Sequence, residues 1–355
     1  MSTNSSTKNR LQLLLETRPC LLADGAIGTN LFAMGLPIGH APELWNLEQP
    51  EKIALLHKNF IEAGADIILT NSFGGTRHRL KLHKAEDRVN EINETAARIA
   101  RQVADNADRD VVVAGSMGPT GELFEPLGPL RPEEGTAAFA EQAQALARGG
   151  ADVLWIETLS SREEVEAAVS ATATTPLPVV VTLSFDTNGS TMMGINPGGL
   201  AALCDELAPR PLAWGTNCGV GAGEVVACIV SLAAASGPGQ VLVAKANCGV
   251  PQWVDGAIRY DATPEVMADY ARLARDAGAR IIGGCCGTTP AHLRAMRHAL
   301  DTHTSGEAPD SATITTKLGE ISAGAKRHWS PDFDSASGVV KRPRRSRRRR
   351  AQEGN

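Results

Sequence analysis

Aromatic residues are scarce in this chain, at 4% of 355 residues, and only two of them are tyrosines, Tyr260 and Tyr270. The chain also lacks any run of about 18 or more uncharged apolar residues, so we expect no transmembrane helix and no membrane partner. Its N-terminal apolar patch is short and interrupted by Glu16 and Arg18, unlike a secretory signal. These absences, together with many Ala, Gly and Val residues, predict a cytoplasmic α/β enzyme.

Basic charge is concentrated at the C-terminal end. The last fifteen residues (341–355) hold eight bases and one acid, which leaves a formal charge of −12 on residues 1–340. From about Thr302 onward the chain is rich in Ser, Thr, Gly and charge, a composition that predicts disorder. The arginine run is either a solvated tail or a segment that contacts an acidic partner or RNA.

Eight short apolar runs alternate with segments of helical period. The runs span residues 21–24, 66–70, 111–115, 152–157, 179–184, 212–217, 241–247 and 280–284. Continuous apolar strands separated by helices predict a parallel sheet covered by helices, and eight such units fit a closed (β/α)8 TIM barrel better than an open sheet. We therefore predict an N-terminal extension at 1–19, the barrel at 20–303, and a disordered tail with an Arg-rich segment at 304–355.

Polar or thiol side chains follow every predicted strand. They are Asp24, Asn71, Ser116, Glu157, Ser184, Asp186, Asn217, Cys218, Asn247, Cys248, Cys285 and Cys286. Each one alone is compatible with a cap or a turn. Because the active sites of such barrels form at the C-terminal ends of the strands, the set as a whole predicts an active site there.

Three of these thiols are expected to converge. Cys218 closes the sixth strand, and Cys285 and Cys286 close the eighth. Three thiolates with a fourth position open are typical of a catalytic zinc site, although three ordinary buried cysteines remain the alternative. Cys248 competes as a ligand because it follows the seventh strand. The other cysteines, Cys20, Cys204 and Cys228, are predicted to lie in the core.

The segments "GGCCGTTPAHL" (283–293) and "NCG" (217–219) resemble the zinc signature of the homocysteine S-methyltransferase family, and the resemblance runs over residues 21–300. Within that family, the segments "DGAIGT" (24–29), "LTNSFGG" (69–75) and "GSMGPTG" (115–121) are similar to the homocysteine-binding module of cobalamin-dependent methionine synthase. The betaine–homocysteine methyltransferases are similar in the zinc signature and in chain length.

The resemblance implies a role for each matching residue. Cys218, Cys285 and Cys286 would be the catalytic ligands of Zn²⁺. Asp24 and Glu157 would hold the ammonium group of the substrate homocysteine, and Gly25 and Asn217 would complete the substrate site. For Asp24 alone a turn-forming Asp-Gly is the alternative, and for Glu157 a helix cap.

This assignment is chemically consistent. A free thiol has a pKa of about 8.5 and is a weak nucleophile near neutral pH, whereas coordination to Zn²⁺ removes its proton. Two carboxylates suit an ammonium group. Backbone N–H groups of the glycine-rich turn 218–224 are expected to hold the substrate's carboxylate.

The methyl donor is less well defined by the sequence. Direct use of betaine requires an aromatic cage around a quaternary ammonium, and both tyrosines are remote in sequence from the predicted rim. Part of a cage is available from Phe32, Trp45, Phe73 and Phe124. We favour methylcobalamin carried by a cobalamin-binding partner, with a methyltetrahydrofolate-binding partner alongside, over betaine or S-methylmethionine used directly.

Two other classes of function remain open from the sequence. The first is a metal-free barrel aldolase or isomerase, with Lys245 at the end of the seventh strand as its Schiff-base residue. Against it, no clear glycine-rich phosphate loop follows the last two strands. The second is a non-catalytic RNA-binding role, which rests on the arginine tail alone.

Overall fold

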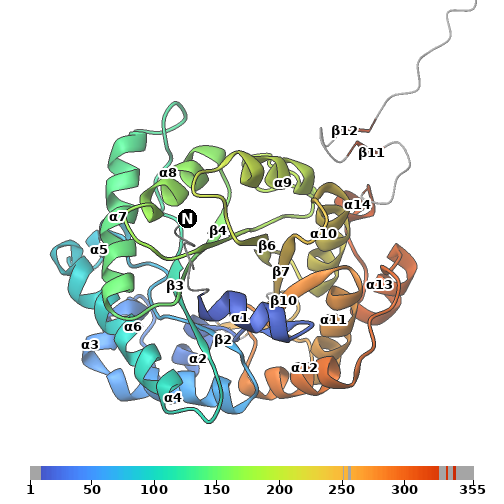
Figure 1. Ribbon diagram of the computed structural model, residues 1–355, viewed down its shortest axis with the longest axis horizontal. Coiled ribbons are helices and arrows are strands. Elements are labelled where there is room, and N and C mark those ends of the chain that lie inside the picture. The colour runs from blue at the N-terminus through green and yellow to red at the C-terminus, as the bar shows by residue number, and fades with distance from the viewer. Residues whose placement is uncertain (1–8, 251, 255–256, 328–332, 335–338, 341–355) are drawn as a thin grey trace, which may run out of the picture.

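Eight parallel strands form a barrel in the computed structural model, which describes residues 9–250, 252–254, 257–327, 333–334 and 339–340 (Figure 1). The strands pair in the order β1-β10-β7-β6-β5-β4-β3-β2, and a bridge between Ala23 and Ile67 joins the two ends of that order. Their bounds are β1 Leu21–Leu22, β2 Ile67–Leu69, β3 Val112–Met117, β4 Val153–Leu159, β5 Val179–Leu183, β6 Ala213–Cys218, β7 Val241–Ala246 and β10 Ala279–Gly284. The predicted (β/α)8 TIM barrel is confirmed.

Helices surround the barrel on its outer side (Figure 1). The longer ones are α4 Pro50–Glu62, α6 Val89–Asp105, α7 Pro132–Arg148, α8 Arg162–Thr172, α9 Pro197–Glu206, α10 Ala222–Ala235, α11 Pro264–Asp276 and α12 Pro290–Thr302. Shorter ones are α1 Arg10–Thr17, α2 Ile27–Ala33, α3 Trp45–Glu48 and α5 Arg77–Lys81, with 3-10 turns η1 Pro42–Leu44 and η2 Glu86–Arg88. Several begin with proline, whose missing N–H costs nothing in the first turn of a helix.

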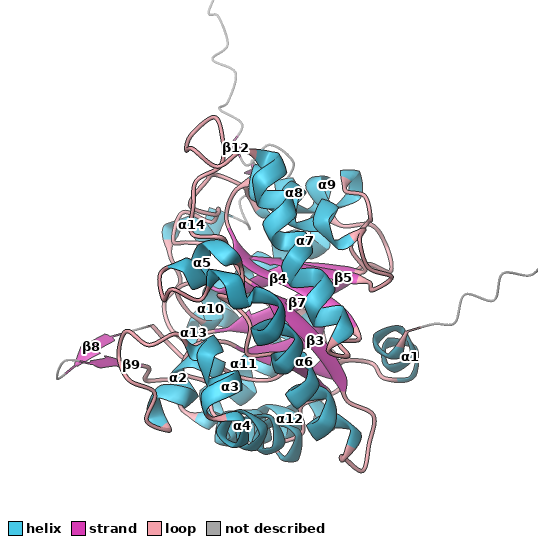
Figure 2. Ribbon diagram, turned by 90° about the vertical axis from the view of Figure 1, so that its left-hand side faces the viewer, coloured by secondary structure: helices cyan, strands magenta, loops and turns pink. Residues whose placement is uncertain are grey.

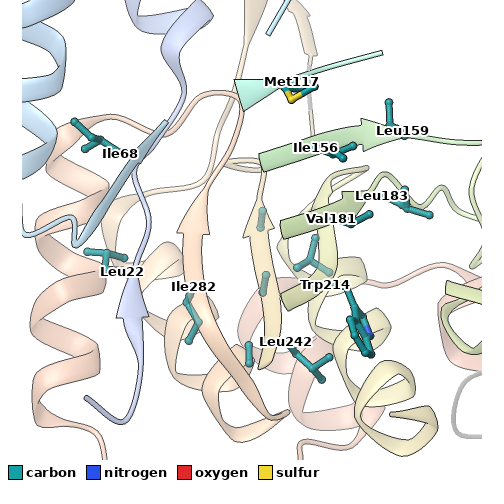
Figure 3. Close-up of a cluster of buried hydrophobic side chains, with 14 of the residues drawn as sticks. Leu22, Ile68, Met117, Ile156, Leu159, Val181, Leu183, Trp214, Leu242 and Ile282 are labelled. Atoms are coloured by element: carbon teal, nitrogen blue, oxygen red, sulfur yellow. The ribbon is translucent and has the colours of Figure 1, made fainter. Parts of the chain in front are cut away.

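The core has two layers because successive strand residues point to opposite faces. The outer layer lies between the sheet and the helices and includes Ile68, Ile156, Val181 and Ile282, which Figure 3 shows on strands β2, β4, β5 and β10. The inner layer fills the barrel with the alternate residues of the strands.

Helix α1 completes the inner layer from the N-terminal end of the barrel. Its leucines Leu11, Leu14 and Leu15 are buried in the same cluster as the inward-facing strand residues. The predicted N-terminal extension therefore contains a helix that covers the bottom of the barrel core.

The prediction of disorder from residue 304 onward is wrong for residues 304–327. Helices α13 (Ser311–Leu318) and α14 (Ala323–Lys326) pack beside α10 and α11 (Figure 1). Ile314 and Ile321 are buried there, and the Ser322 N–H donates to Glu224 Oε1 at 2.6 Å. The apolar residues Ile314, Leu318 and Ile321 supply this docking, and their helical spacing of i, i+4 and i+7 is easily overlooked in a segment so rich in Ser and Thr. The Arg-rich segment 341–350 lies outside the described residues.

Two small hairpins lie outside the barrel. Strands β8 (Gln252–Val254) and β9 (Ala257–Arg259) pair between β7 and α11, and Figure 2 shows them projecting at the end of the barrel opposite α1. Strands β11 (Phe333–Asp334) and β12 (Val339–Val340) form the second. In the part of the chain that the structure describes, no helix combines the length and the apolar character needed to cross a membrane.

Candidate active site

The three predicted thiols meet at the C-terminal rim of the barrel. The sulfur atoms of Cys218, Cys285 and Cys286 all lie within 4.8 Å of one another, although the chain between them is long. Cys218 ends β6 and the other two follow β10, and the sheet places β7 between those two strands. The predicted convergence of the three thiols is thus present in the structure.

Asn247, which follows β7, ties the two thiol-bearing loops together. Its Oδ1 accepts a hydrogen bond of 3.0 Å from the Cys286 N–H, and its Nδ2 donates to the Gly219 carbonyl at 2.7 Å. Cys218 itself has φ of +62°, a left-handed conformation that is uncommon for a non-glycine residue. Such backbone strain persists only where surrounding contacts fix it, and it concentrates at functional sites.

In the absence of a metal the cluster is a set of protonated thiols. Chiefly the hydrogen bond with Cys285, and also burial, raises the pKa of Cys218 to about 12. The hydrogen bond with Cys218, together with burial, raises the pKa of Cys286 to about 11. Three close sulfur donors on one rim match the preference of soft-ligand metals such as zinc, so the donor set fits the predicted Zn²⁺.

The other cysteines do not join the cluster. Cys248 Sγ donates to the Ala262 carbonyl at 3.0 Å and lies 3.3 Å from His292 Nε2, so its thiol is directed to a different contact. Among the described residues the metal-capable group contains Cys218, Cys285 and Cys286 and not Cys248. Cys20, Cys204 and Cys228 are buried in the core, as predicted.

A cavity of about 320 Å³ opens beside the thiols. Its lining includes all three of them, Glu157 at the end of β4, and Lys245 on β7. Glu157 is 8% exposed, and its Oε1 accepts a 2.5 Å hydrogen bond from the Ser116 hydroxyl. Burial raises the pKa of the Glu157 carboxyl above its usual range. The cavity is therefore lined by both sulfur ligands and a carboxylate.

Asp24 is placed differently from Glu157. Its side chain is fully buried, its Oδ1 lies 2.7 Å from Lys245 Nζ, and its Oδ2 accepts a 2.7 Å hydrogen bond from the Leu69 N–H. Burial by itself lowers the pKa of Lys245, but the carboxylates of Asp24 and Glu157 more than offset this and the net shift is upward. Lys245 is therefore protonated at neutral pH, which makes it a poor Schiff-base nucleophile.

The two remaining predicted residues, Asn217 and Gly25, stabilise the backbone around the cavity. Asn217 is fully buried, and its amide binds Thr158 at both ends: the Thr158 N–H donates to Oδ1 at 2.9 Å, and Nδ2 donates to Thr158 Oγ1 at 2.7 Å. Gly25 lines the cavity, and a Cβ there would lie 2.7 Å from the Thr288 carbonyl oxygen. Glycine is thus required at residue 25 for close approach of two backbone segments.

Sequence reasoning missed three residues of this region. Glu43 lines the cavity with its Oε1 held by the Gly74 N–H at 2.6 Å, and Thr158 is the hydrogen-bond partner of Asn217. Tyr260 hydrogen-bonds to Cys286 although it had been considered remote from the rim. The β8–β9 hairpin returns the chain to the thiols just before Tyr260, and no local sequence signal marks such a return.

Only two aromatic rings of the expected set reach the cavity. Phe32 and Phe73 line it, whereas Trp45 and Phe124 are buried away from it. Trp45 instead packs under Lys52, whose Nζ lies 4.4 Å from the ring centroid. The described part of the cavity is therefore poor in aromatic surface.

The fold and the site together define a TIM-barrel enzyme with a cluster of three thiols at its catalytic rim. The family model described as "Homocysteine S-methyltransferase" matches residues 21–300. The chain therefore belongs to the homocysteine S-methyltransferase family.

Individual relatives agree with this placement. The chain is 31% identical over 297 residues to a methionine synthase of Mycobacterium tuberculosis and 30% identical over 315 residues to one of Mycobacterium leprae, covering 79% and 83% of this chain. It spans about a quarter of the length of these relatives, 24% and 26% respectively.

A solved structure is similar over nearly its whole length. The metallated form of the homocysteine methyltransferase MmuM from Escherichia coli superposes with a TM-score of 0.68 at 28% identity, covering 82% of this chain and 99% of that one. The oxidized form of the same protein gives a TM-score of 0.67, also at 28% identity.

Proposed function

We propose that the protein is a zinc-dependent homocysteine S-methyltransferase that forms methionine. The observation that carries this proposal is the cluster of Cys218, Cys285 and Cys286 sulfur atoms within 4.8 Å, in the lining of the cavity that also contains Glu157. Zinc bound there would keep the substrate's sulfur deprotonated and nucleophilic at neutral pH.

The chain's own residues would orient the substrate. Glu157 is the cavity carboxylate best placed for the substrate's ammonium group, because one of its oxygens is fixed by Ser116 and the side chain faces the cavity. Asn217 holds Thr158, the residue after Glu157, and so limits the movement of that carboxylate. Orientation of this kind brings the sulfur into line with the incoming methyl group.

For the methyl donor we propose methylcobalamin on a partner protein, as in a methionine synthase divided between chains. Two findings support this choice. The cavity has only Phe32 and Phe73 as aromatic lining in its described part, which is little for a cage around the quaternary ammonium of betaine. The chain is also about 30% identical to two proteins named methionine synthase, over about a quarter of their length.

A second candidate is direct transfer from a small donor such as betaine or S-methylmethionine. The similarity to the E. coli homocysteine methyltransferase MmuM favours it, because 99% of that chain superposes on the barrel described here. In either case we place the reaction in the cytoplasm, since seven free thiols persist best in a reducing compartment.

An assay with separate donors tests the proposal. Zinc-loaded protein is given homocysteine with methylcobalamin, betaine or S-methylmethionine, and methionine is quantified. We expect methionine with methylcobalamin and none with betaine, and no product from Cys286→Ala with any donor. Turnover with betaine alone would overturn the choice of donor, and no methionine with any of the three would overturn the function.

A further inference from the structure

The cavity contains a buried cation that the reaction as described does not use. Lys245 is 2% exposed, and it is the only lysine or arginine among the described residues that line the cavity. In the sheet it lies beside Asn217 of β6 on one side and Gly283 of β10 on the other. Asn217 directly precedes Cys218, and Gly283 lies two residues before Cys285. Its ammonium group therefore projects from the strand between the two sources of thiols.

Lys245 has donors to spare. A lysine ammonium has three N–H donors, and the hydrogen bond found for this one goes to Asp24 Oδ1 at 2.7 Å. The ring of Trp155 lies near it, with its centroid 5.6 Å from Nζ, and provides no oxygen acceptor. A buried cation with unused donors at a cavity wall favours an anionic group on whatever ligand enters the cavity.

The substrate's carboxylate has no other basic partner there. The glycine-rich turn 218–224 was expected to bind it through backbone N–H groups, but of that turn only Cys218 lines the cavity. The Gly219 N–H is already used, donating to Ser184 Oγ at 3.2 Å. The expected role of this turn therefore has no support in the geometry.

Lys245 also changes what Asp24 can do. Asp24 is fully buried, and both of its carboxylate oxygens already accept hydrogen bonds, one of them from the Lys245 ammonium group. Unlike Glu157, it therefore has no free lone pair directed at the cavity. Lys245 thus takes the place beside Asp24 that a substrate ammonium would otherwise occupy. Of the two carboxylates predicted to bind the substrate's amino group, Glu157 is the one left for that role.

We propose that Lys245 is a specificity-determining residue that selects the substrate's carboxylate, with Asp24 as its internal counter-ion and Glu157 as the separate partner of the substrate's ammonium. This inference rests on the proposed function, because it concerns how the same site distinguishes amino-acid thiols from other thiols. It assigns the two charged groups of homocysteine to side chains of two different strands, β7 and β4.

The test compares two truncated substrates. 3-Mercaptopropylamine is homocysteine without its carboxylate, and 4-mercaptobutyrate is homocysteine without its amino group. Binding of each to zinc-loaded protein is measured by titration calorimetry, with zinc content determined for every variant. The quantity of interest is the ratio of affinities, 4-mercaptobutyrate over 3-mercaptopropylamine, because a general loosening of the fold weakens both ligands alike and leaves the ratio unchanged.

Lys245→Met should lower this ratio by about tenfold or more, since it removes a charged hydrogen-bond donor and leaves the Asp24 carboxylate without its partner. The double variant Asp24→Asn with Lys245→Met carries no unpaired buried charge, and its ratio should fall between those of the wild type and the single variant. Lys245→Arg should keep most of the preference. Lys58→Met, which removes an exposed lysine of α4, should leave the ratio unchanged.

An unchanged ratio in both Lys245→Met and the double variant would overturn the inference, and the double variant decides the matter if the single variant does not fold. Failure of the proposed function would give a different experimental result from failure of this inference. In that case zinc-loaded wild-type protein would not bind homocysteine at all, whereas failure of this inference alone leaves homocysteine bound and the ratio insensitive to residue 245.

Discussion

Asn217 and Thr158 are joined by two hydrogen bonds, of 2.9 and 2.7 Å, across the ends of β4 and β6. Thr158 has φ of +66°, so its backbone is held in the same uncommon left-handed region as that of Cys218. Because Cys218 follows Asn217 and Glu157 precedes Thr158, this pair connects a proposed metal ligand to the proposed ammonium partner. The two halves of the site are thus positioned by one buried amide.

Replacing that amide tests its importance. Asn217→Ala leaves the Thr158 N–H and hydroxyl unsatisfied in a buried region, so the free energy of unfolding should fall by about 1–3 kcal/mol. Homocysteine affinity should fall as well, because Glu157 is less well fixed. Chemical denaturation measures the first effect and calorimetry the second. Asn90→Ala on the exposed face of α6 is the control, and equal stability of the two variants would contradict this role.

Zinc content should follow the cluster residue by residue. We expect about one zinc per chain in the purified protein. Cys286→Ala should lose the metal, because the two remaining thiolates are too few ligands to hold zinc. Cys248→Ala should retain the metal because its thiol binds the Ala262 carbonyl. Metal analysis by mass spectrometry gives the zinc content of both variants. A variant series in which Cys248 rather than Cys286 controls zinc content would refute the ligand assignment.

Zinc binding should release protons. With pKa values raised to about 12 for Cys218 and about 11 for Cys286, these thiols are protonated at pH 7 in the metal-free protein and must lose their protons to bind the metal. Zinc affinity should therefore rise with pH across the neutral range. The hydrogen bond with Cys218 lowers the pKa of the third thiol, Cys285, but the hydrogen bond with Cys286 and burial raise it further, so the net shift is upward. A pH-indicator dye in weakly buffered solution should therefore show close to three protons released per zinc. Release of none would mean that the metal binds elsewhere.

Glu157 should control recognition of the amino group. Glu157→Gln should weaken homocysteine binding by about tenfold or more while zinc is retained, because a charged hydrogen bond is replaced by a neutral one. Burial raises the pKa of this carboxyl, so wild-type affinity should fall with decreasing pH at values above the usual glutamate range, as the carboxylate becomes protonated.

Calorimetry at several pH values, with zinc content checked at each, measures this dependence. Glu166→Gln on the exposed face of α8 should bind like the wild type. If Glu157→Gln keeps both the wild-type affinity and its pH dependence, Glu157 does not hold the ammonium group.

The barrel and the thiol cluster were accessible from the sequence for physical reasons. Eight apolar runs between amphipathic helices can be buried only in a parallel sheet, and a closed parallel sheet brings the ends of all its strands to one rim. Cys218, Cys285 and Cys286 are at such ends, so their meeting follows from topology alone.

Other parts of the site depend on three-dimensional detail that no local pattern contains. The pair between Asp24 and Lys245 joins residues 221 positions apart, and it requires both side chains to point into the same part of the barrel. Tyr260 reaches Cys286 only because a hairpin turns the chain back to the rim. Helix α13 was missed because its apolar residues Ile314 and Leu318 lie in a segment otherwise rich in Ser and Thr, and their burial is visible only once α10 is in place.

The central claim is that three cysteine thiolates and the substrate's sulfur share one zinc. X-ray absorption at the zinc edge counts the sulfur neighbours of the metal directly. For the zinc-loaded protein the account predicts three sulfur neighbours, from Cys218, Cys285 and Cys286, and four after addition of homocysteine. A sulfur count that does not change when homocysteine is added would contradict it.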